Sequence, residues 1–321
     1  MAPADEVLTT IALDMEPRWV AAAPDGSRVY VTLSEVQADG PTLGAVAVIE
    51  TETCDVLAKL SLGDPSGVAV SPDGRRAYVP NRDPRDGRGV VSVIDTATNA
   101  IAGSVAVSAP SGSPKGVAVT PDGRNVYVAT EHEELDGQGM VSVIDAETED
   151  VVATIGVNPF PAAVAIRPDG RFAYVLDLDG DPAVIDTVSL ERTFPFGGQL
   201  SAARIAFSPD GAHAYAIRDA DTQVFVIDGA TAETVQMLEA SGLTTDLAVG
   251  PDRRVYVTQR TRHQLSVFET GTPAAPSHPV GWSGTADGIA LMPDGRTAWV
   301  SDRASRAVRV VPVGPRPGGR L

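Results

Sequence analysis

Short runs of apolar residues recur along the whole chain, and clusters of turn residues separate them. Between Gly67 and Asn81 the run GVAV is followed by the turn SPDG and then by a second run that ends in Tyr-Val. A polar loop leads to VVSVID at 90–95, the turn TATN, and AIAGSVAV at 100–107. Because Pro presets φ in such turns and Gly accepts positive φ, the pattern predicts hairpins. Four short strands rich in β-branched residues are therefore expected in each unit.

The turn Pro-Asp-Gly occurs six times in register, and a seventh copy reads Pro-Asp-Arg. Successive copies lie 48, 49, 47, 41, 42 and 42 residues apart. A strand-rich repeat of roughly 40–50 residues is typical of a β-propeller, with one blade for each copy. The sequence therefore predicts an all-β fold, a seven-bladed β-propeller with four-stranded antiparallel blades. The copies begin at Pro24, Pro72, Pro121, Pro168, Pro209, Pro251 and Pro293.

The two ends of the chain predict how the ring closes. The segment EVLTTIALD at 6–14 matches the outer-strand phrase of the other repeats, such as DVLAKLSLGD at 55–64, whereas the last repeat stops near Val313 without one. We expect the N-terminal strand to complete the last blade, because closure removes exposed sheet edges. Residues 1–313 are then a single propeller domain, and residues 314–321 are expected to be a disordered tail.

The phrase SPDG-x-x-x-YV followed by VSVID resembles the YVTN-repeat family of seven-bladed β-propellers. The tetrad that gives this family its name reads YVTL, YVPN, YVAT, YVLD, YAIR, YVTQ and WVSD in the seven repeats. The resemblance covers nearly the whole chain and implies the architecture and a usual binding face. The family includes lyases, lactonase-like enzymes, metal-cofactor modules, binding proteins and surface-layer proteins, so the resemblance does not select one function. The aromatic residue of each tetrad, Tyr or Trp299, is expected to be structural.

Composition and charge remove several classes of function. The net charge of −17 disfavours nucleic acid as a partner. Cys54 is the only cysteine, so the chain has no internal disulfide and no Cys-x-x-Cys site. The phrase DLDGD at 177–181 lacks the later Glu of a calcium loop, and we expect no metal and no cofactor. Without a secretory signal or an apolar stretch of membrane length, we expect a cytoplasmic, monomeric protein with no membrane partner. The Arg-rich, Lys-poor composition indicates a bacterial source.

Comparing the seven repeats with one another identifies a candidate site. Each blade meets the same packing demands, so a large or charged residue at a position that is small in most blades is a candidate for function. Two neighbouring positions at the start of the first strand break the small-residue rule. First strands line the channel of a propeller, so these residues are expected to ring one mouth of it. They are Arg18, Trp19, Lys115, Arg204, Asp246 and Asp287.

The loops after the second strands are expected on the same face. They are long in the first three blades, as in TEHEELDGQG, and short in the others. Glu131 and His132 in this loop region are the candidates for proton transfer, since a His or carboxylate near a ligand serves as general base. His263 and Trp282 are further candidates for the wall of the site. Arg18, Lys115 and Arg204 are suited to an anionic or carbonyl-containing ligand.

Two interpretations of this pattern remain open. The first is a small-molecule site at the channel mouth, either in a hydrolase, lyase or cyclase of bacterial specialised metabolism or in a non-catalytic binding protein. The alternative is a protein-interaction scaffold without chemistry. The charged pairs Arg204 with Asp246 and Asp287 with Arg18 also have a purely structural interpretation as ion pairs between adjacent blades. The sequence does not decide whether a reaction is catalysed.

Overall fold

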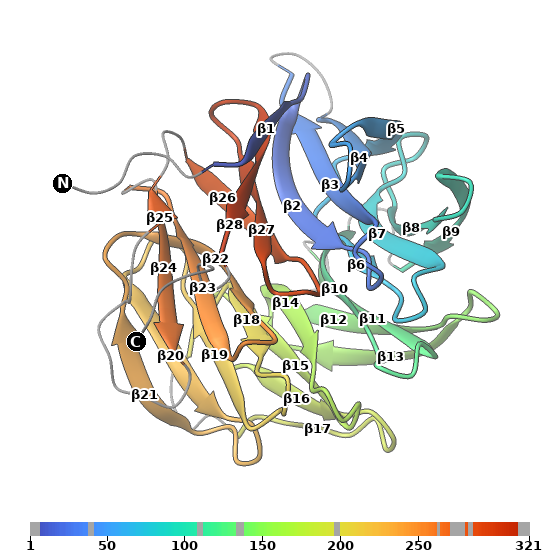
Figure 1. Ribbon diagram of the computed structural model, residues 1–321. Coiled ribbons are helices and arrows are strands. Elements are labelled where there is room, and N and C mark those ends of the chain that lie inside the picture. The colour runs from blue at the N-terminus through green and yellow to red at the C-terminus, as the bar shows by residue number, and fades with distance from the viewer. Residues whose placement is uncertain are drawn as a thin grey trace.

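The computed structural model confirms the seven-bladed propeller (Figure 1). It describes residues 7–37, 42–107, 112–132, 138–195, 200–261, 264–269, 280–281 and 285–313. Within these ranges the chain forms 28 strands, β1 to β28, and no helix. The described residues therefore contain no helix that is long and apolar enough to cross a membrane. His263, Trp282 and the C-terminal segment 314–321 lie outside the described residues.

The first four blades follow one another along the chain, each an antiparallel meander. Blades one and two also share a single bridge between Gly63 and Arg82, so their strands form one continuous sheet. Blade one holds β2 (Glu16–Ala22), β3 (Arg28–Glu35), β4 (Leu43–Glu50) and β5 (Val56–Gly63). Blade two holds β6 (Ala69–Val70), β7 (Arg76–Arg82), β8 (Gly89–Asp95) and β9 (Ala100–Ala106). Blade three holds β10 (Gly112–Val119), β11 (Asn125–His132), β12 (Gly139–Asp145) and β13 (Val151–Val157). Blade four holds β14 (Pro161–Ile166), β15 (Phe172–Asp177), β16 (Ala183–Asp186) and β17 (Arg192–Thr193).

The last three blades complete the ring. Blade five holds β18 (Arg204–Phe207), β19 (His213–Ile217), β20 (Gln223–Asp228) and β21 (Thr234–Glu239). Blade six holds β22 (Thr244–Val249), β23 (Arg254–Gln259), β24 (Gln264–Glu269) and β25 (Val280–Gly281). Blade seven holds β26 (Ala286–Leu291), β27 (Thr297–Asp302), β28 (Ala307–Pro312) and, as its outer strand, β1 (Thr9–Ala12).

Ring closure joins the two ends of the chain in one sheet. Strand β1 pairs antiparallel with β28, from Thr9 opposite Val310 to Ala12 opposite Ala307. The expected N-terminal outer strand is therefore present. In Figure 1 the first strands β2, β10, β14, β18, β22 and β26 surround the centre of the ring, and the outer strands lie at its rim. The starts of the first strands consequently meet at one end of the channel.

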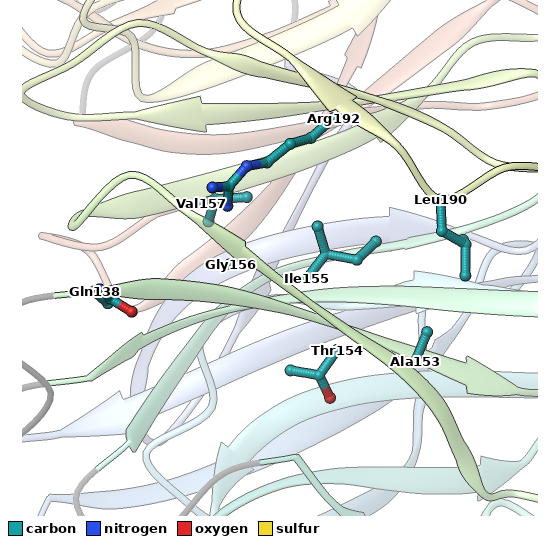
Figure 2. Close-up of a pocket in the computed structure, with 8 residues that line it drawn as sticks. All are labelled: Gln138, Ala153, Thr154, Ile155, Gly156, Val157, Leu190 and Arg192. Atoms are coloured by element: carbon teal, nitrogen blue, oxygen red, sulfur yellow. The ribbon is translucent and has the colours of Figure 1, made fainter.

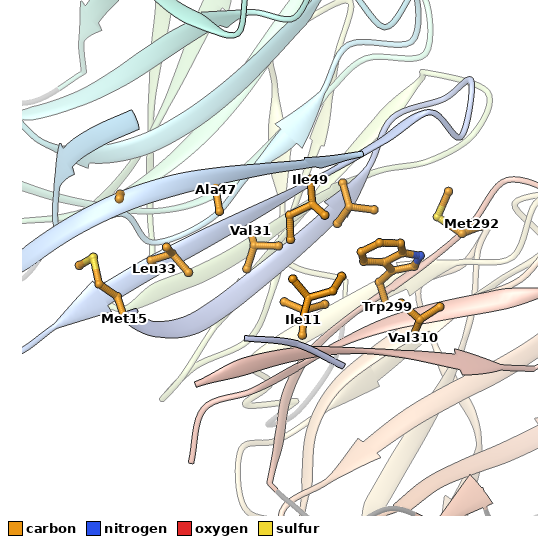
Figure 3. Packing of buried hydrophobic residues seen from close by; sticks show 12 residues of the cluster. Ile11, Met15, Val31, Leu33, Ala47, Ile49, Met292, Trp299 and Val310 are labelled. Carbon is orange, nitrogen blue, oxygen red and sulfur yellow. The ribbon is translucent and has the colours of Figure 1, made fainter. Parts of the chain in front are cut away.

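Each interface between neighbouring blades contains one buried aromatic ring from a second strand. Trp299 on β27 is 1% exposed and packs between blades seven and one, against Ile11, Val31, Ile49 and Met292 (Figure 3). The Tyr residues of the other six tetrads are equally buried, at 2% exposure or less. All seven rings are therefore buried, as expected for structural residues. They are Tyr30, Tyr78, Tyr127, Tyr174, Tyr215 and Tyr256.

Candidate functional site at the channel mouth

Bulges in the first strands bring the unusual residues to the channel mouth. The pairing of β2 with β3 shifts register between Pro17 and Val20, and that of β22 with β23 shifts between Thr244 and Leu247. Similar shifts interrupt β10, β14 and β26. A bulge leaves residues out of the regular ladder and re-aims their side chains. The residues that break the small-residue rule in β2, β10, β22 and β26 lie inside these shifts.

Hydroxyl groups on the second strands stabilise three of the bulges. The amide of Trp19 donates to Thr32 Oγ1 at 3.0 Å, and the amide of Asp246 donates to Thr258 Oγ1 at 2.9 Å. In blade seven the amide of Gly288 donates to the Oγ of Ser301 at 2.7 Å. Each hydroxyl accepts a bond from an amide that the bulge removes from the ladder, so a buried donor is satisfied. In blades six, seven and one, the backbone at the mouth is therefore fixed by the same type of hydrogen bond, from a bulge amide to a hydroxyl of the second strand.

A cavity of about 380 Å³ opens at this mouth, and the predicted cations lie in its wall. Arg18, Lys115 and Arg204 come from blades one, three and five, so they converge from different sides of the ring. Apolar side chains and three carboxylates complete the wall. The lining residues are Arg18, Trp19, Ser34, Asp64, Pro65, Ser66, Lys115, Glu131, Phe160, Pro161, Ala162, Leu178, Ala203, Arg204 and Asp219.

Arg204 is held between an aromatic face and a buried carboxylate. Its guanidinium carbon lies 3.8 Å from the centre of the Trp19 ring, a cation–π contact between blades five and one. Its Nε is 3.8 Å from Asp246 Oδ1, and its Nη1 donates to the carbonyl of Ala203 at 2.7 Å. Burial lowers the pKa of Arg204, although Asp246 acts in the opposite direction. The Nε is buried on the side of Asp246 and has no hydrogen-bond partner among the described residues.

The other two cations differ in their partners. Lys115 Nζ lies 3.3 Å from Glu131 Oε2, so these two groups form an ion pair in the cavity wall. Arg18 Nε donates to Ser34 Oγ at 2.9 Å. Burial and the nearby charge of Arg303 lower the pKa of Arg18. Both cations are thus fixed at the wall of the cavity by contacts to the second strands of their own blades.

Asp246 and Asp287 lie behind the cavity rather than in its wall. Asp246 accepts bonds from the amides of Leu247 and Ile289, each at 2.9 Å, so it connects blades six and seven. Burial raises the pKa of Asp246 to about 6, and the charge of Asp287 acts in the same direction. Burial also raises the pKa of Asp287, whose Oδ1 is 3.9 Å from Arg260 Nη2. Of the two structural pairs expected from the sequence, Arg204 with Asp246 is present, whereas Asp287 pairs with Arg260 instead of Arg18.

The structure separates the two candidates for proton transfer. Glu131 lines the cavity, but His132 does not and is only 6% exposed. Adjacent residues of a strand point to opposite faces, and both lie at the end of β11. Burial lowers the pKa of His132. In this structure His132 therefore lies away from the cavity wall, and its role in proton transfer stays a prediction. His263 and Trp282 fall outside the described residues.

Sequence comparison missed several residues of the wall. Phe160 and Leu178 are 38% and 49% exposed and form an apolar edge contributed by blade four. Asp64 and Asp219 come from connections that follow β5 and β19. These positions lie outside the repeated phrases, so the seven copies provided no register in which to compare them. Asp64 is the exception, because it lies just before the first strand of the second blade, and that position could have suggested a place near the channel mouth.

A larger hollow at the rim of the ring is a weaker candidate. It has a volume of about 580 Å³ and lies beside β13, where blade four contributes only the two-residue outer strand β17. Figure 2 shows Arg192 extending over Gly156 and Val157, with Leu190 and Ile155 farther along the groove. Among the described residues, Arg192 is the only charged side chain in its wall. Charged groups from several blades converge at the channel mouth, whereas no such convergence occurs at this hollow.

In the described ranges, no group of three or more His, Cys, Asp or Glu could hold a metal ion.

Asp246 gives the stability of the fold a distinctive pH dependence. Because the folded pKa is about 6 and the ordinary value is 3.8, the folded state binds the Asp246 proton more tightly than the unfolded state. The resulting stabilisation is full below about pH 4 and is lost as the pH rises through 6. We expect the free energy of unfolding, relative to that of Asp246→Asn, to fall by about 1 kcal/mol between pH 5 and pH 7.

Urea denaturation of both proteins at several pH values measures this difference. Asp219→Asn is the matched control, because the Asp219 side chain is 62% exposed and should give a curve parallel to that of the unmodified protein. A constant difference between the unmodified protein and Asp246→Asn over this range would show that Asp246 is charged throughout.

Comparison with known proteins assigns the family. The model of the family described as "Lactonase, 7-bladed beta-propeller" matches residues 51–318. The chain belongs to this family. The hydrazine synthase of Kuenenia stuttgartiensis has a similar solved structure, with a TM-score of 0.74 and 19% identity over 96% of this chain and 98% of that one. At this identity the likeness concerns the fold alone. No curated protein matches the sequence. The more specific resemblance to YVTN repeats is not confirmed by these comparisons.

Proposed function

We propose that this lactonase-family propeller binds a small carbonyl-containing molecule at the channel mouth and hydrolyses a cyclic ester. The observation that carries the proposal is the convergence of Arg18, Lys115 and Arg204 on one cavity that also contains the Glu131 carboxylate. Guanidinium and ammonium groups stabilise the negative charge that develops on a carbonyl oxygen during attack. A concave, mixed polar and apolar wall favours a small ligand over the flat surface expected of an interaction scaffold. A role in bacterial specialised metabolism and a cytoplasmic location remain predictions from the sequence.

The chemistry requires a base, an attacking water and an acid for the leaving group. In the proposed reaction, Glu131 takes a proton from water as the hydroxide oxygen bonds to the acyl carbon of the lactone. Arg18 or Arg204 stabilises the oxyanion. The ring C–O bond then breaks, and the alkoxide takes a proton from the Lys115 ammonium, which recovers one from Glu131 at 3.3 Å. Lactone and water thus become one hydroxy acid, and both protein groups return to their initial state.

The test is Glu131→Gln, which keeps the size of the side chain and removes the base. We expect kcat for a responsive lactone to fall about 100-fold or more, which is the usual contribution of general-base catalysis. The dissociation constant of the lactone should change little. A pH-stat assay with unsubstituted and amino-substituted γ- and δ-lactones measures the acid released, and calorimetry measures binding.

Glu52→Gln provides the control, because Glu52 is exposed in a turn and does not line the cavity. It should hydrolyse lactones as the unmodified protein does. If Glu131→Gln retained full activity, the assignment of the base would be wrong. If the unmodified protein hydrolysed no lactone of the panel, the proposed reaction would be rejected.

A further inference from the structure

The charged groups in the wall of the channel-mouth cavity fall into two sets. Four of the six have a partner of opposite charge. Lys115 and Glu131 pair with each other, at 3.3 Å. Arg204 has Asp246 behind it at 3.8 Å, and Asp219 Oδ1 lies 3.7 Å from Arg260 Nη2. For these four groups, contact with the protein already offsets much of the charge that faces the cavity.

Arg18 and Asp64 form the second set, since neither has such a partner. Within the described part of the chain, no carboxylate oxygen lies within 4.0 Å of the Arg18 guanidinium. Its one side-chain bond is to the neutral Ser34 hydroxyl, which leaves both terminal nitrogens free for a ligand. Asp64 is exposed, and among the described residues no Lys or Arg nitrogen lies within 4.0 Å of its carboxylate oxygens. Among the described residues, the cavity wall therefore presents one cation and one anion that have no ion-pair partner.

These two groups are close without touching. Both line the same cavity. Burial and the charge of Arg303 lower the pKa of Arg18, whereas the carboxylates of Asp287, Glu16 and Asp64 raise it. The two groups form no ion pair with each other, so a ligand in this shared cavity can meet both charges. A purely anionic ligand at Arg18 would meet the repulsion of Asp64, and a purely cationic ligand at Asp64 would meet that of Arg18. A ligand with both charges avoids both penalties.

We propose that the cavity selects a zwitterionic ligand, with an amine at Asp64 and a carboxylate or polarised carbonyl oxygen at Arg18. The proposal rests on the proposed function, because it assumes that the ligand site is at this mouth. The ligand class with both charges is the product class, amino acids with a hydroxyl group. A lactone that carries a free amine would place its ammonium at Asp64 and only the carbonyl dipole, not a full negative charge, at Arg18. The apolar wall formed by Trp19, Phe160 and Leu178 accommodates the methylene groups that separate the two charges.

Matched small molecules test the selectivity directly. Calorimetric or NMR titration compares γ-aminobutyrate with butyrate and with butylamine, which have the same chain length and only one charge each. Glycine, β-alanine and 6-aminohexanoate vary the separation between the charges. We expect at least one amino acid of the series to bind about 10-fold more tightly than the matched carboxylate and the matched amine.

Two substitutions assign the selectivity to individual residues. Asp64→Asn should abolish the preference over the carboxylate, and Asn tolerates the positive φ of 39° at this position. Arg18→Gln should abolish the preference over the amine. Glu52→Gln is the control, because Glu52 is an exposed carboxylate outside the cavity, and it should keep both preferences.

The possible outcomes separate this inference from the reaction. Equal binding of each amino acid and its matched single ions, or preferences that survive both Asp64→Asn and Arg18→Gln, would overturn the zwitterion proposal. Hydrolysis of unsubstituted lactones with no preference for α-amino-γ-butyrolactone would overturn it as well, while leaving the reaction intact. Tight amino-acid binding that Asp64→Asn abolishes, in a protein that hydrolyses no lactone, would support the ligand class and reject the reaction.

Discussion

Trp299→Ala is expected to lower the free energy of unfolding by about 3–5 kcal/mol, the usual cost of removing a large buried aromatic side chain. Trp299 is 1% exposed and packs at the interface where blade seven meets blade one (Figure 3). Its neighbours come from the N-terminal strand, from β3 and β4, and from β28. A cavity at this position therefore weakens the contacts that close the ring. Chemical denaturation followed by far-ultraviolet circular dichroism measures the loss.

Trp299→Tyr is the matched control, because the other six blades carry Tyr at the same register. A smaller aromatic ring leaves a smaller cavity, and we expect a loss below about 1.5 kcal/mol. Similar losses for Ala and Tyr would show that the indole, rather than any aromatic ring, is required at the closing interface. A loss below 1 kcal/mol for Trp299→Ala would contradict the role given to this side chain.

The fold could be predicted from the sequence because each blade repeats the same physical requirements. The turn before each second strand and the aromatic ring after it recur in seven copies, so every copy supports the interpretation of the others. The glycines at 26, 74, 123, 170, 211 and 295 adopt positive φ, as the turn requires. In the copy that reads Pro-Asp-Arg, Arg253 adopts a φ of 63°, which preserves the turn without Gly. The hairpin thus tolerates one exception to its sequence rule.

The candidate site could be predicted only in part. Arg18, Trp19, Lys115 and Arg204 were identified because they occupy positions with equivalents in every blade. For Arg18, Trp19 and Lys115 a bulge then determines the final direction of the side chain, and the small-residue rule does not show where a bulge occurs. The Thr and Ser hydroxyls that support three bulges, Thr32, Thr258 and Ser301, occupy the third position of their tetrads. Polar residues at that position were the signal that comparison of the repeats could have used.

The different positions of Glu131 and His132 have a simple geometric cause. The sequence placed Glu131 and His132 in one long loop, where either side chain was free to face the ligand. In the structure, β11 continues to His132, so the two residues alternate across a strand and only Glu131 lines the cavity. A difference of two residues in the length of a strand therefore determines which of the two side chains lines the cavity.

The network behind the mouth links the site to the integrity of the ring. Thr245 Oγ1 donates to the carbonyl of Ala286 at 2.8 Å, and Ser301 Oγ donates to the carbonyl of Arg18 at 2.7 Å. These bonds connect blade six with seven and blade seven with one. The backbone that carries Arg18 is therefore held by the same contacts that close the propeller. Damage to the closure should consequently weaken ligand binding before the whole fold unfolds.

Removal of residues 1–12 tests the closure itself. The deletion removes β1, which pairs with β28 over four residues and buries Ile11 to 7% exposure. We expect a loss of about 2–5 kcal/mol in unfolding free energy, from the burial of apolar surface and the strand pairing together. The open edge of β28 should also promote association between molecules, because unpaired strand edges are templates for pairing. Thermal denaturation and size-exclusion chromatography measure the two effects.

Two point variants separate pairing from burial in this strand. Ile11→Asp places a charge in the closing core and should reproduce most of the stability loss, whereas Thr10→Asp changes the exposed face of the same strand. The latter should stay within about 0.5 kcal/mol of the unmodified protein, as is usual for surface substitutions. If the deletion left both stability and oligomeric state unchanged, the four-residue pairing would not be what closes the ring. A larger loss for Thr10→Asp than for Ile11→Asp would instead mean that β1 presents its other face to the core.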